Sequence, residues 1–209
     1  MVVHTGFDGT LQGVFSNFII EAQERLESGV DPAEIIGNNL HIGAIFDRNE
    51  FERAPMLSKW AIRVVHSIME TNYNVTVFAS TYLYWALIRW MVQPSKDHFE
   101  AIPSWLRPSP NQLFMPHPMV VDFVFWPALR EYVVQFPLLQ VGMSWLLDMT
   151  NTLKCDWEGT TEDALERKDG TVGLTKNAKD FIFKLENWSI GPSFRQYIPN
   201  ADIFVNIRT

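Results

Sequence analysis

The chain has 209 residues, of which 47% are hydrophobic and 20% are charged, and this composition excludes a disordered or fibrous protein. Its 24 acidic residues outnumber its 17 Lys and Arg, for a formal net charge of -7, and the basic residues are scattered along the chain. Because clustered basic residues supply most of the affinity for nucleic acid, we expect no direct binding of nucleic acid by this chain.

The N-terminus and the single cysteine bear on location and cofactors. Residues 1–8 lack the charged and apolar regions of a secretory signal. Cys155 has no internal disulfide partner, so we expect it to pack in the interior of a protein from the cytoplasm, or from the nucleus if the chain is a regulator. The five histidines are dispersed and no glycine-rich phosphate loop is present, so we expect neither a metal nor another cofactor.

The first half of the chain has helical periodicity almost throughout. Apolar residues recur every three or four positions over residues 11–26, which predicts an amphipathic helix. Asp31 and Pro32 then provide a cap and a first-turn proline for a second helix, predicted to run to about Phe46. A third helix is predicted to start at Pro55.

The fourth predicted helix, over residues 73–92, is apolar around most of its girth. It is nearly long enough to span a membrane, but it contains Arg89 and several hydroxyl side chains. A charged side chain in the middle of a bilayer is costly, so we expect no membrane insertion and assign this segment to the centre of a soluble bundle.

Seven prolines fall within residues 94–127, and they exclude long helices there. We predict an ordered connector wrapped on the bundle. Two helices, over residues 129–136 and 138–153, are predicted to follow it.

The last quarter of the chain begins with an acidic loop over residues 156–174, with room for a short helix at 161–167. A helix over 175–185 is predicted next, and residues 203–207 form either a strand or an extended tail. The predicted fold is therefore mainly α, a single-domain helical bundle over residues 1–209 that carries a proline-rich connector.

Three polar residues near the connector are candidates for chemistry. His117 lies between two prolines, Asp122 follows five positions later, and Arg130 eight positions after that. In one interpretation, these groups tie the connector to the bundle through satisfied hydrogen bonds, with Asp122 and Arg130 paired. In the other, His117 faces a cavity as a general acid or base and Asp122 fixes its tautomer.

Arg89 is a fourth candidate catalytic group, because it stands alone in an apolar helix. We expect it to reach towards solvent, to pair with a buried acid such as Asp148, or to line a pocket.

Eight tryptophans and eight methionines are more than core packing alone usually requires. Side chains of these two types suit the lining of a pocket for a bulky apolar ligand. The predicted lining residues are Trp60, Trp85, Trp90, Met115, Trp126, Trp145 and Met149.

Several motifs occur in a characteristic order. They are Asn38-Asn39-Leu-x-Ile-Gly43, Tyr84-x4-Arg89-Trp90, Ile102-Pro-x-Trp-Leu-Arg-Pro108, Pro116-His-Pro118, Trp126-Pro-x-Leu-Arg130 and Asn187-Trp-Ser-Ile-Gly-Pro-Ser-Phe-x-x-Tyr-x-Pro199. This order resembles a fungal domain of unknown function that usually forms the C-terminal part of ascomycete basic-leucine-zipper regulators. The resemblance covers about residues 35–200.

In those regulators the domain follows a basic region and a leucine zipper, and residues 1–58 show neither. We therefore expect a complete, stand-alone copy without a DNA-reading segment. It is either a regulator-like module for ligand sensing or protein contact, or an enzyme of fungal secondary metabolism.

The enzyme that we favour at this point is a cofactor-independent cyclase of Diels–Alder type. It would fold an apolar intermediate in the Trp- and Met-lined pocket, while His117, Arg89 or Arg130 polarises a carbonyl. The sequence leaves the substrate open, and it allows a homodimer.

Overall fold

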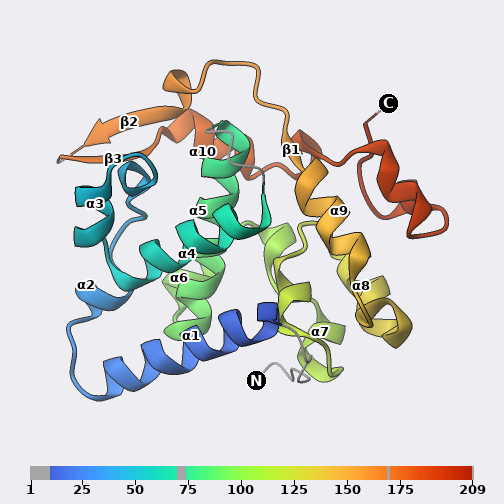
Figure 1. The fold of residues 1–209 in the computed structure, drawn as a ribbon, viewed down its shortest axis with the longest axis horizontal. Coiled ribbons are helices and arrows are strands. Elements are labelled where there is room, and N and C mark those ends of the chain that lie inside the picture. The colour runs from blue at the N-terminus through green and yellow to red at the C-terminus, as the bar shows by residue number, and fades with distance from the viewer. Residues whose placement is uncertain (1–9, 70–73, 169, 209) are drawn as a thin grey trace.

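The computed structural model describes residues 10–69, 74–168 and 170–208, and Figure 1 shows their arrangement. The predicted mainly α class is confirmed. The α-helices are α1 (Thr10–Glu27), α2 (Pro32–Ile35), α3 (Arg48–Arg53), α4 (Met56–Ile68), α5 (Val75–Val92), α6 (Lys96–Glu100), α7 (Pro110–Phe114), α8 (Pro127–Gln135), α9 (Ser144–Thr152) and α10 (Lys176–Ile182).

The described strands form two small antiparallel sheets. Strand β1 (Lys154–Cys155) pairs with β4 (Trp188–Ser189), and β2 (Leu165–Lys168) pairs with β3 (Thr171–Leu174) as a hairpin. The 3-10 helices that matter below are η1 (Ile42–Ile45) and η3 (Met119–Phe123).

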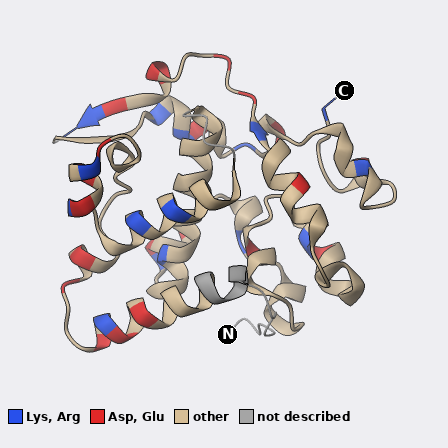
Figure 2. Cartoon of the chain, viewed as in Figure 1, with Lys and Arg blue, Asp and Glu red and all other residues tan. Residues whose placement is uncertain are grey.

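Helix α5 lies near the centre of the molecule (Figure 1), where it packs against α4, α1, α6 and β1. Asn74 caps its N-terminus by accepting a hydrogen bond from the amide of Val77; Tyr73, where the predicted helix began, lies outside the described residues. The helix passes the length and composition test for a membrane span, yet 78% of that window is buried inside the fold, as in the core helix of a soluble protein. Figure 2 shows charged residues mostly on the surrounding elements.

The helix predicted from Pro32 to Phe46 is wrong. It ends after one turn, because Gly37 has a φ of 64°. A Cβ added at Gly37 would also lie only 2.7 Å from Cγ of Pro55, so this close approach requires glycine. The chain therefore crosses residues 37–41 without regular structure and reaches η1, which is packed against α3 and the hairpin.

The helix predicted over residues 138–153 is also interrupted. Gly142 and Met143 both have positive φ values, of 77° and 44°, and α9 begins only at Ser144. The left-handed conformation of two successive residues cannot be part of an α-helix.

The acidic loop contains an unpredicted element, the β2–β3 hairpin, in place of most of the short helix expected at 161–167. The pair Asp169-Gly170 in the sequence is a strong signal for a hairpin turn. The prediction of a loop rested instead on the acidic residues that surround this pair. Further on, Ile207 makes a single parallel bridge to Ile190, so the predicted strand at 203–207 is reduced to this contact.

The proline-rich connector folds into short helical turns that include α6, α7 and η3. Its final section is more deeply placed than a surface wrapping would be, since every residue from His117 to Trp126 is buried. The backbone groups of a buried, irregular segment need hydrogen-bond partners from elsewhere, and side chains of the connector and of α8 supply several of them.

Candidate functional site

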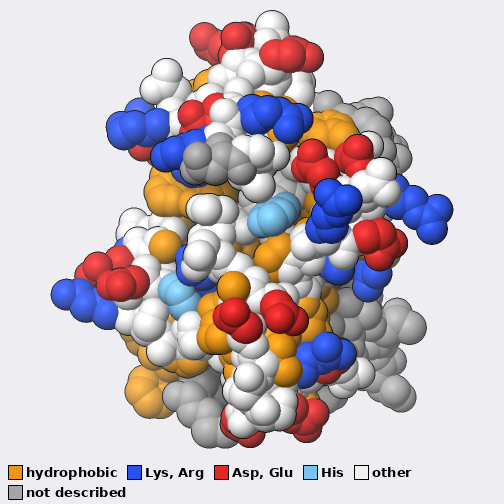
Figure 3. Space-filling model, turned by 90° about the vertical axis from the view of Figure 1, so that its left-hand side faces the viewer, with side chains coloured by type: hydrophobic (Ala, Val, Ile, Leu, Met, Phe, Trp, Pro, Cys, Tyr) orange, Lys and Arg blue, Asp and Glu red, His pale blue; other side chains and the backbone are white. Residues whose placement is uncertain are grey.

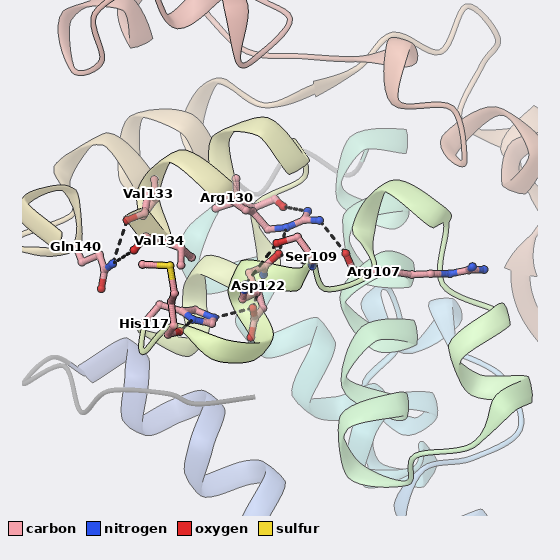
Figure 4. Close-up of polar contacts among 11 residues, drawn as sticks. Arg107, Ser109, His117, Asp122, Arg130, Val133, Val134 and Gln140 are labelled. Atoms are coloured by element: carbon pink, nitrogen blue, oxygen red, sulfur yellow. Dashed lines mark hydrogen bonds and ion pairs between the residues drawn. The ribbon is translucent and has the colours of Figure 1, made fainter. Parts of the chain in front are cut away.

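Arg130, on α8, is completely buried, and each N–H of its guanidinium has an acceptor. Its Nε donates to Oε1 of Gln112 at 2.9 Å. The two Nη groups donate to four backbone carbonyls, those of Trp105, Arg107, Val124 and Phe125. Arg130 therefore joins two parts of the connector to α8, as Figure 4 shows.

Gln112 links Arg130 to the other two polar candidates. Its Nε2 donates to Oδ1 of Asp122 at 2.5 Å, and the same Oδ1 lies 3.0 Å from Nε2 of His117. The predicted pairing of Asp122 with Arg130 is thus made through Gln112, which the sequence analysis did not single out as a candidate.

The surroundings of His117 favour its charged form. Its Nδ1 lies 2.8 Å from the carbonyl oxygen of Met115, which can only accept, so Nδ1 carries a proton. Its Nε2 faces the carboxylate of Asp122, so a second proton is favoured there. Desolvation by burial lowers the pKa of His117, but the bond and charge of Asp122, together with the Met115 carbonyl, outweigh it and raise the pKa overall.

At Arg130, by contrast with His117, the effect of burial on the pKa outweighs that of the neighbouring charges. Burial lowers the pKa of that guanidinium to about 10, although the charges of Asp122 and Glu131 partly oppose the shift. At neutral pH the group remains a cation, and its acceptors replace the water that it has lost.

His117, Asp122 and Arg130 are at most 1% exposed, and none of them lines any of the three hollows described below. Their geometry matches the interpretation in which they tie the connector to the bundle. Gln112 belongs to the same network, and only its position between the other groups in space identifies it.

Three hollows border the described residues. One, of about 630 Å³, lies between α1, α2 and α4, and its lining carries charges of both signs. A second, apolar and of about 20 Å³, lies beside Phe15 and Tyr84 and is too small for an organic ligand. The third, of about 700 Å³, is open to solvent and lies within the size range of ligand sites.

The third hollow is called the hairpin hollow below. One wall is the β2–β3 hairpin and α10, a second is the segment from Gly37 to Ile42, and the floor is α5. Its lining residues are Ala33, Gly37, Asn38, Asn39, Leu40, His41, Ile42, Arg53, Pro55, Tyr82, Trp85, Arg89, Ala101, Glu166, Lys168, Thr171, Gly173, Leu174 and Lys179.

Two of the predicted site residues, Trp85 and Arg89, line the hairpin hollow. They are one helical turn apart on α5, and the guanidinium carbon of Arg89 lies 5.0 Å from the centre of the Trp85 ring. Arg89 makes none of the predicted contact with Asp148, whose carboxylate instead accepts a hydrogen bond from Ser193.

The remaining predicted lining residues do not meet in one chamber. Trp60 borders the hollow beside α1 and stacks on Phe18, and Trp90 packs against Phe99. The indole of Trp145 donates to a backbone carbonyl. Five of the predicted lining residues are buried or half-buried and line none of the three hollows. They are Trp90, Met115, Trp126, Trp145 and Met149.

Sequence reasoning missed Tyr82 and Lys179, which meet in the hairpin hollow although 97 positions separate them in the chain. The Lys179 ammonium lies 5.6 Å from the centre of the Tyr82 ring, within the range of a cation–π contact. Tyr82 sits three positions before Trp85 on α5, and this helical spacing was the available signal.

Cys155 is buried and has no disulfide, and burial raises the pKa of its thiol to about 12. The group is therefore unreactive at neutral pH. Among residues 10–69, 74–168 and 170–208, no three His, Cys, Asp or Glu side chains lie together in a way that could hold a metal ion.

Comparison with known families gives one match. A family model described as a domain of unknown function (DUF3425) matches residues 85–200, which is more than half of the chain. The chain belongs to this family. No curated protein and no solved structure matches the chain.

The DUF3425 match confirms the resemblance, although it begins at residue 85 and not near residue 35. The matched range contains the whole network from Gln112 to Arg130. It also contains one wall of the hairpin hollow, the hairpin with α10, and the part of the floor formed by Trp85 and Arg89. Tyr82 and the segment from Gly37 to Ile42 lie outside the DUF3425 match.

Proposed function

We propose that the chain is a small-molecule-binding protein that acts as a ligand-sensing module, with its site in the hairpin hollow. The observation that carries this proposal is the floor of the hollow, where the aromatic rings of Tyr82 and Trp85 adjoin a guanidinium that has no hydrogen-bond acceptor within the described part of the chain. Aromatic surface and a few polar groups are the usual composition of a ligand site.

The ligand-sensing version suits this geometry better than the cyclase version. Two of the three donors considered for a cyclase, His117 and Arg130, hold the connector in place and face neither the hairpin hollow nor the other two hollows. A cofactor-independent cyclase is retained as a second candidate on one observation, that Arg89 borders the hollow and could polarise a carbonyl there.

The test of the proposed function is to fill the hairpin hollow. A Cβ at Gly173 meets no atom within 4 Å and the residue has no positive φ, so Gly173→Trp adds bulk to the hollow without backbone strain. We expect this variant to abolish the ligand-observed NMR signals given by a panel of small aromatic acids, amides and alcohols. The matched control is Asn177→Trp, at an exposed position on α10 outside the hollow, which should keep them.

Two outcomes would overturn the proposed function. One is that no member of the panel binds at about 1 mM, a weak limit for a specific site. The other is that Gly173→Trp leaves binding as it was, which would place the ligand elsewhere.

The cyclase candidate has a separate readout, because a pericyclic ring closure forms an isomer of its substrate. Incubation with a conjugated polyene that carries a carbonyl should give a product of the same mass and a new retention time. If Arg89→Gln leaves the rate of such a conversion unchanged, Arg89 is not the polarising donor.

A further inference from the structure

The hairpin hollow has a charge opposite to that of the whole chain. The chain carries a formal charge of -7, but the lining of the hollow has four basic side chains and one acidic one. The basic side chains are Arg53, Arg89, Lys168 and Lys179, and the acid is Glu166. The four basic side chains come from four separate segments of the chain, so it is the fold that brings them together. Figure 3 shows the side of the molecule on which the hairpin, α2 and α3 lie, with apolar side chains in recesses between projecting charged ones.

Arg89 is half-buried, and within the described residues its guanidinium contacts the ring of Trp85 but has no anionic partner. Within residues 10–69, 74–168 and 170–208 its guanidinium forms no ion pair and donates no hydrogen bond, and its Nε is buried without an acceptor. Desolvation by burial lowers the pKa of Arg89, and the nearby Tyr82 offsets this only in part. A half-buried cation without an anionic partner has lost part of its hydration, and an anion placed beside it would compensate for that loss.

Trp85, next to Arg89, also has a hydrogen-bond donor without an acceptor among the described residues. The indole Nε1 of Trp85 is buried without an acceptor in the described part of the chain. By contrast, the indole nitrogens of Trp105, Trp145 and Trp188 donate to backbone carbonyls within the fold. The floor of the hollow is therefore deficient in acceptors, whereas the network around Arg130 is fully bonded.

We infer that the ligand of the hairpin hollow is an organic anion, a carboxylate carried on an aromatic or conjugated body. This inference rests on the proposed function and specifies its ligand class. The fork of N–H groups on a guanidinium matches the two oxygens of a carboxylate. The body of the ligand would lie on the aromatic surface around Tyr82, where Lys179 makes a cation–π contact.

The first arm of the experiment uses the unaltered protein and two probes of the same shape. Calorimetric titration with 2-naphthoate is compared with titration with the neutral 2-naphthamide. Because a hydrogen bond to a charged group is worth more than one to a neutral group, we expect 2-naphthoate to bind about tenfold more tightly. The difference should shrink as salt is added, since ions screen a partly exposed pair. This arm depends on no variant folding correctly.

The second arm removes the cation at the floor. Arg89→Gln should reduce the affinity for 2-naphthoate to about that for 2-naphthamide, a loss of about tenfold. Arg167→Gln is the matched control, because Arg167 is exposed on β2 of the same hairpin and does not line the hollow. It should leave both affinities unchanged, and circular dichroism of each variant checks that the fold is retained.

The outcomes separate this inference from the proposed function. If 2-naphthamide binds as tightly as 2-naphthoate and Gly173→Trp abolishes both, the anion inference is overturned and small-molecule binding is supported. Equal losses of affinity for 2-naphthoate in Arg89→Gln and Arg167→Gln would also overturn it. Arg89 would then act only through the overall positive charge near the hollow and not by contacting the ligand. If neither probe nor any other member of the panel binds, both proposals fail.

Discussion

At the scale of single residues, the buried Arg130 and the half-buried Arg89 differ in how their guanidinium groups are bonded. Arg130 has an acceptor for every N–H, whereas Arg89 has none within the described residues. The spacing of His117, Asp122 and Arg130 suits a folded-back segment and allowed two interpretations, of which a tie between the connector and the bundle matches the observed hydrogen bonds. The sequence could not show Gln112 as the link, since it does not reveal which groups the amide of a buried glutamine meets in space.

The raised pKa of His117 predicts a pH dependence of stability. A histidine whose pKa is higher in the folded state stabilises the fold fully below its unfolded pKa of 6.5, and this contribution is lost as the pH rises through the folded value. The free energy of unfolding of the protein, minus that of His117→Gln, should therefore decrease between about pH 5 and pH 8. Urea denaturation at a series of pH values measures it.

His41 provides the control of opposite sign. Desolvation lowers its pKa, with Glu50 opposing in part, so the stabilising contribution of His41 should increase with pH. The same subtraction with His41→Gln should therefore rise as the pH increases towards 6.5, below the range in which the difference for His117→Gln falls. A flat or rising difference for His117→Gln would show that the imidazole is not charged in the network.

At the scale of elements, local backbone chemistry decided where the predictions succeeded. The helices at 11–26, from Pro55 and at 129–136 were predicted within a few residues, because their apolar periodicity is regular. The helices predicted over 32–46 and 138–153 were broken by Gly37 and Gly142, whose positive φ values periodicity does not reveal. The hairpin was missed because each strand has only four residues and β2 is mostly exposed, so neither strand shows a clear alternation of apolar residues.

Gly37 gives the prediction at this scale. Gly37→Ala would place a side chain at a φ of 64° and bring its Cβ to 2.7 Å from Pro55, so we expect a loss of about 1–3 kcal/mol in the free energy of unfolding. Gly173→Ala is the matched control, because its Cβ enters open space. Chemical denaturation compares the two, and equal effects would refute the steric account.

At the scale of the whole molecule, the boundaries of the family match differ from those of the core. The match begins at residue 85, inside α5. Phe123 lies well within the match. Its ring packs against Phe15, Trp60 and Tyr84, all of which precede the first matched residue. The structure therefore buries the matched region against residues that the match leaves out.

A fragment limited to residues 85–200 should consequently fail to unfold cooperatively. It would expose the surface of α5 that α1 and α4 cover, together with one side of Phe123. Thermal unfolding followed by circular dichroism, with the fragment 10–208 as the control, provides the measurement. A sharp transition for the shorter fragment would show that α1 and α4 are dispensable.

The same scale explains why the candidate site was only partly predictable. Trp85 and Arg89 were identified because they stand out within one helix. The hairpin hollow depends on segments from both ends of the chain, and Lys179 reaches Tyr82 only through the fold. The net charge of the chain was also a poor guide to the site. A formal charge of -7 describes the whole chain, whereas the lining of the hairpin hollow is mostly basic.

The guanidinium of Arg130 also constrains how the protein can open. Its acceptors come from residues 105, 107, 112, 124 and 125, so a single side chain is bonded to both ends of the connector at once. Neither end can detach while the other stays in place without leaving a buried cation partly unbonded. The connector and α8 are thereby made into one unit of local unfolding, and their amide protons should exchange with solvent water only when the whole unit separates.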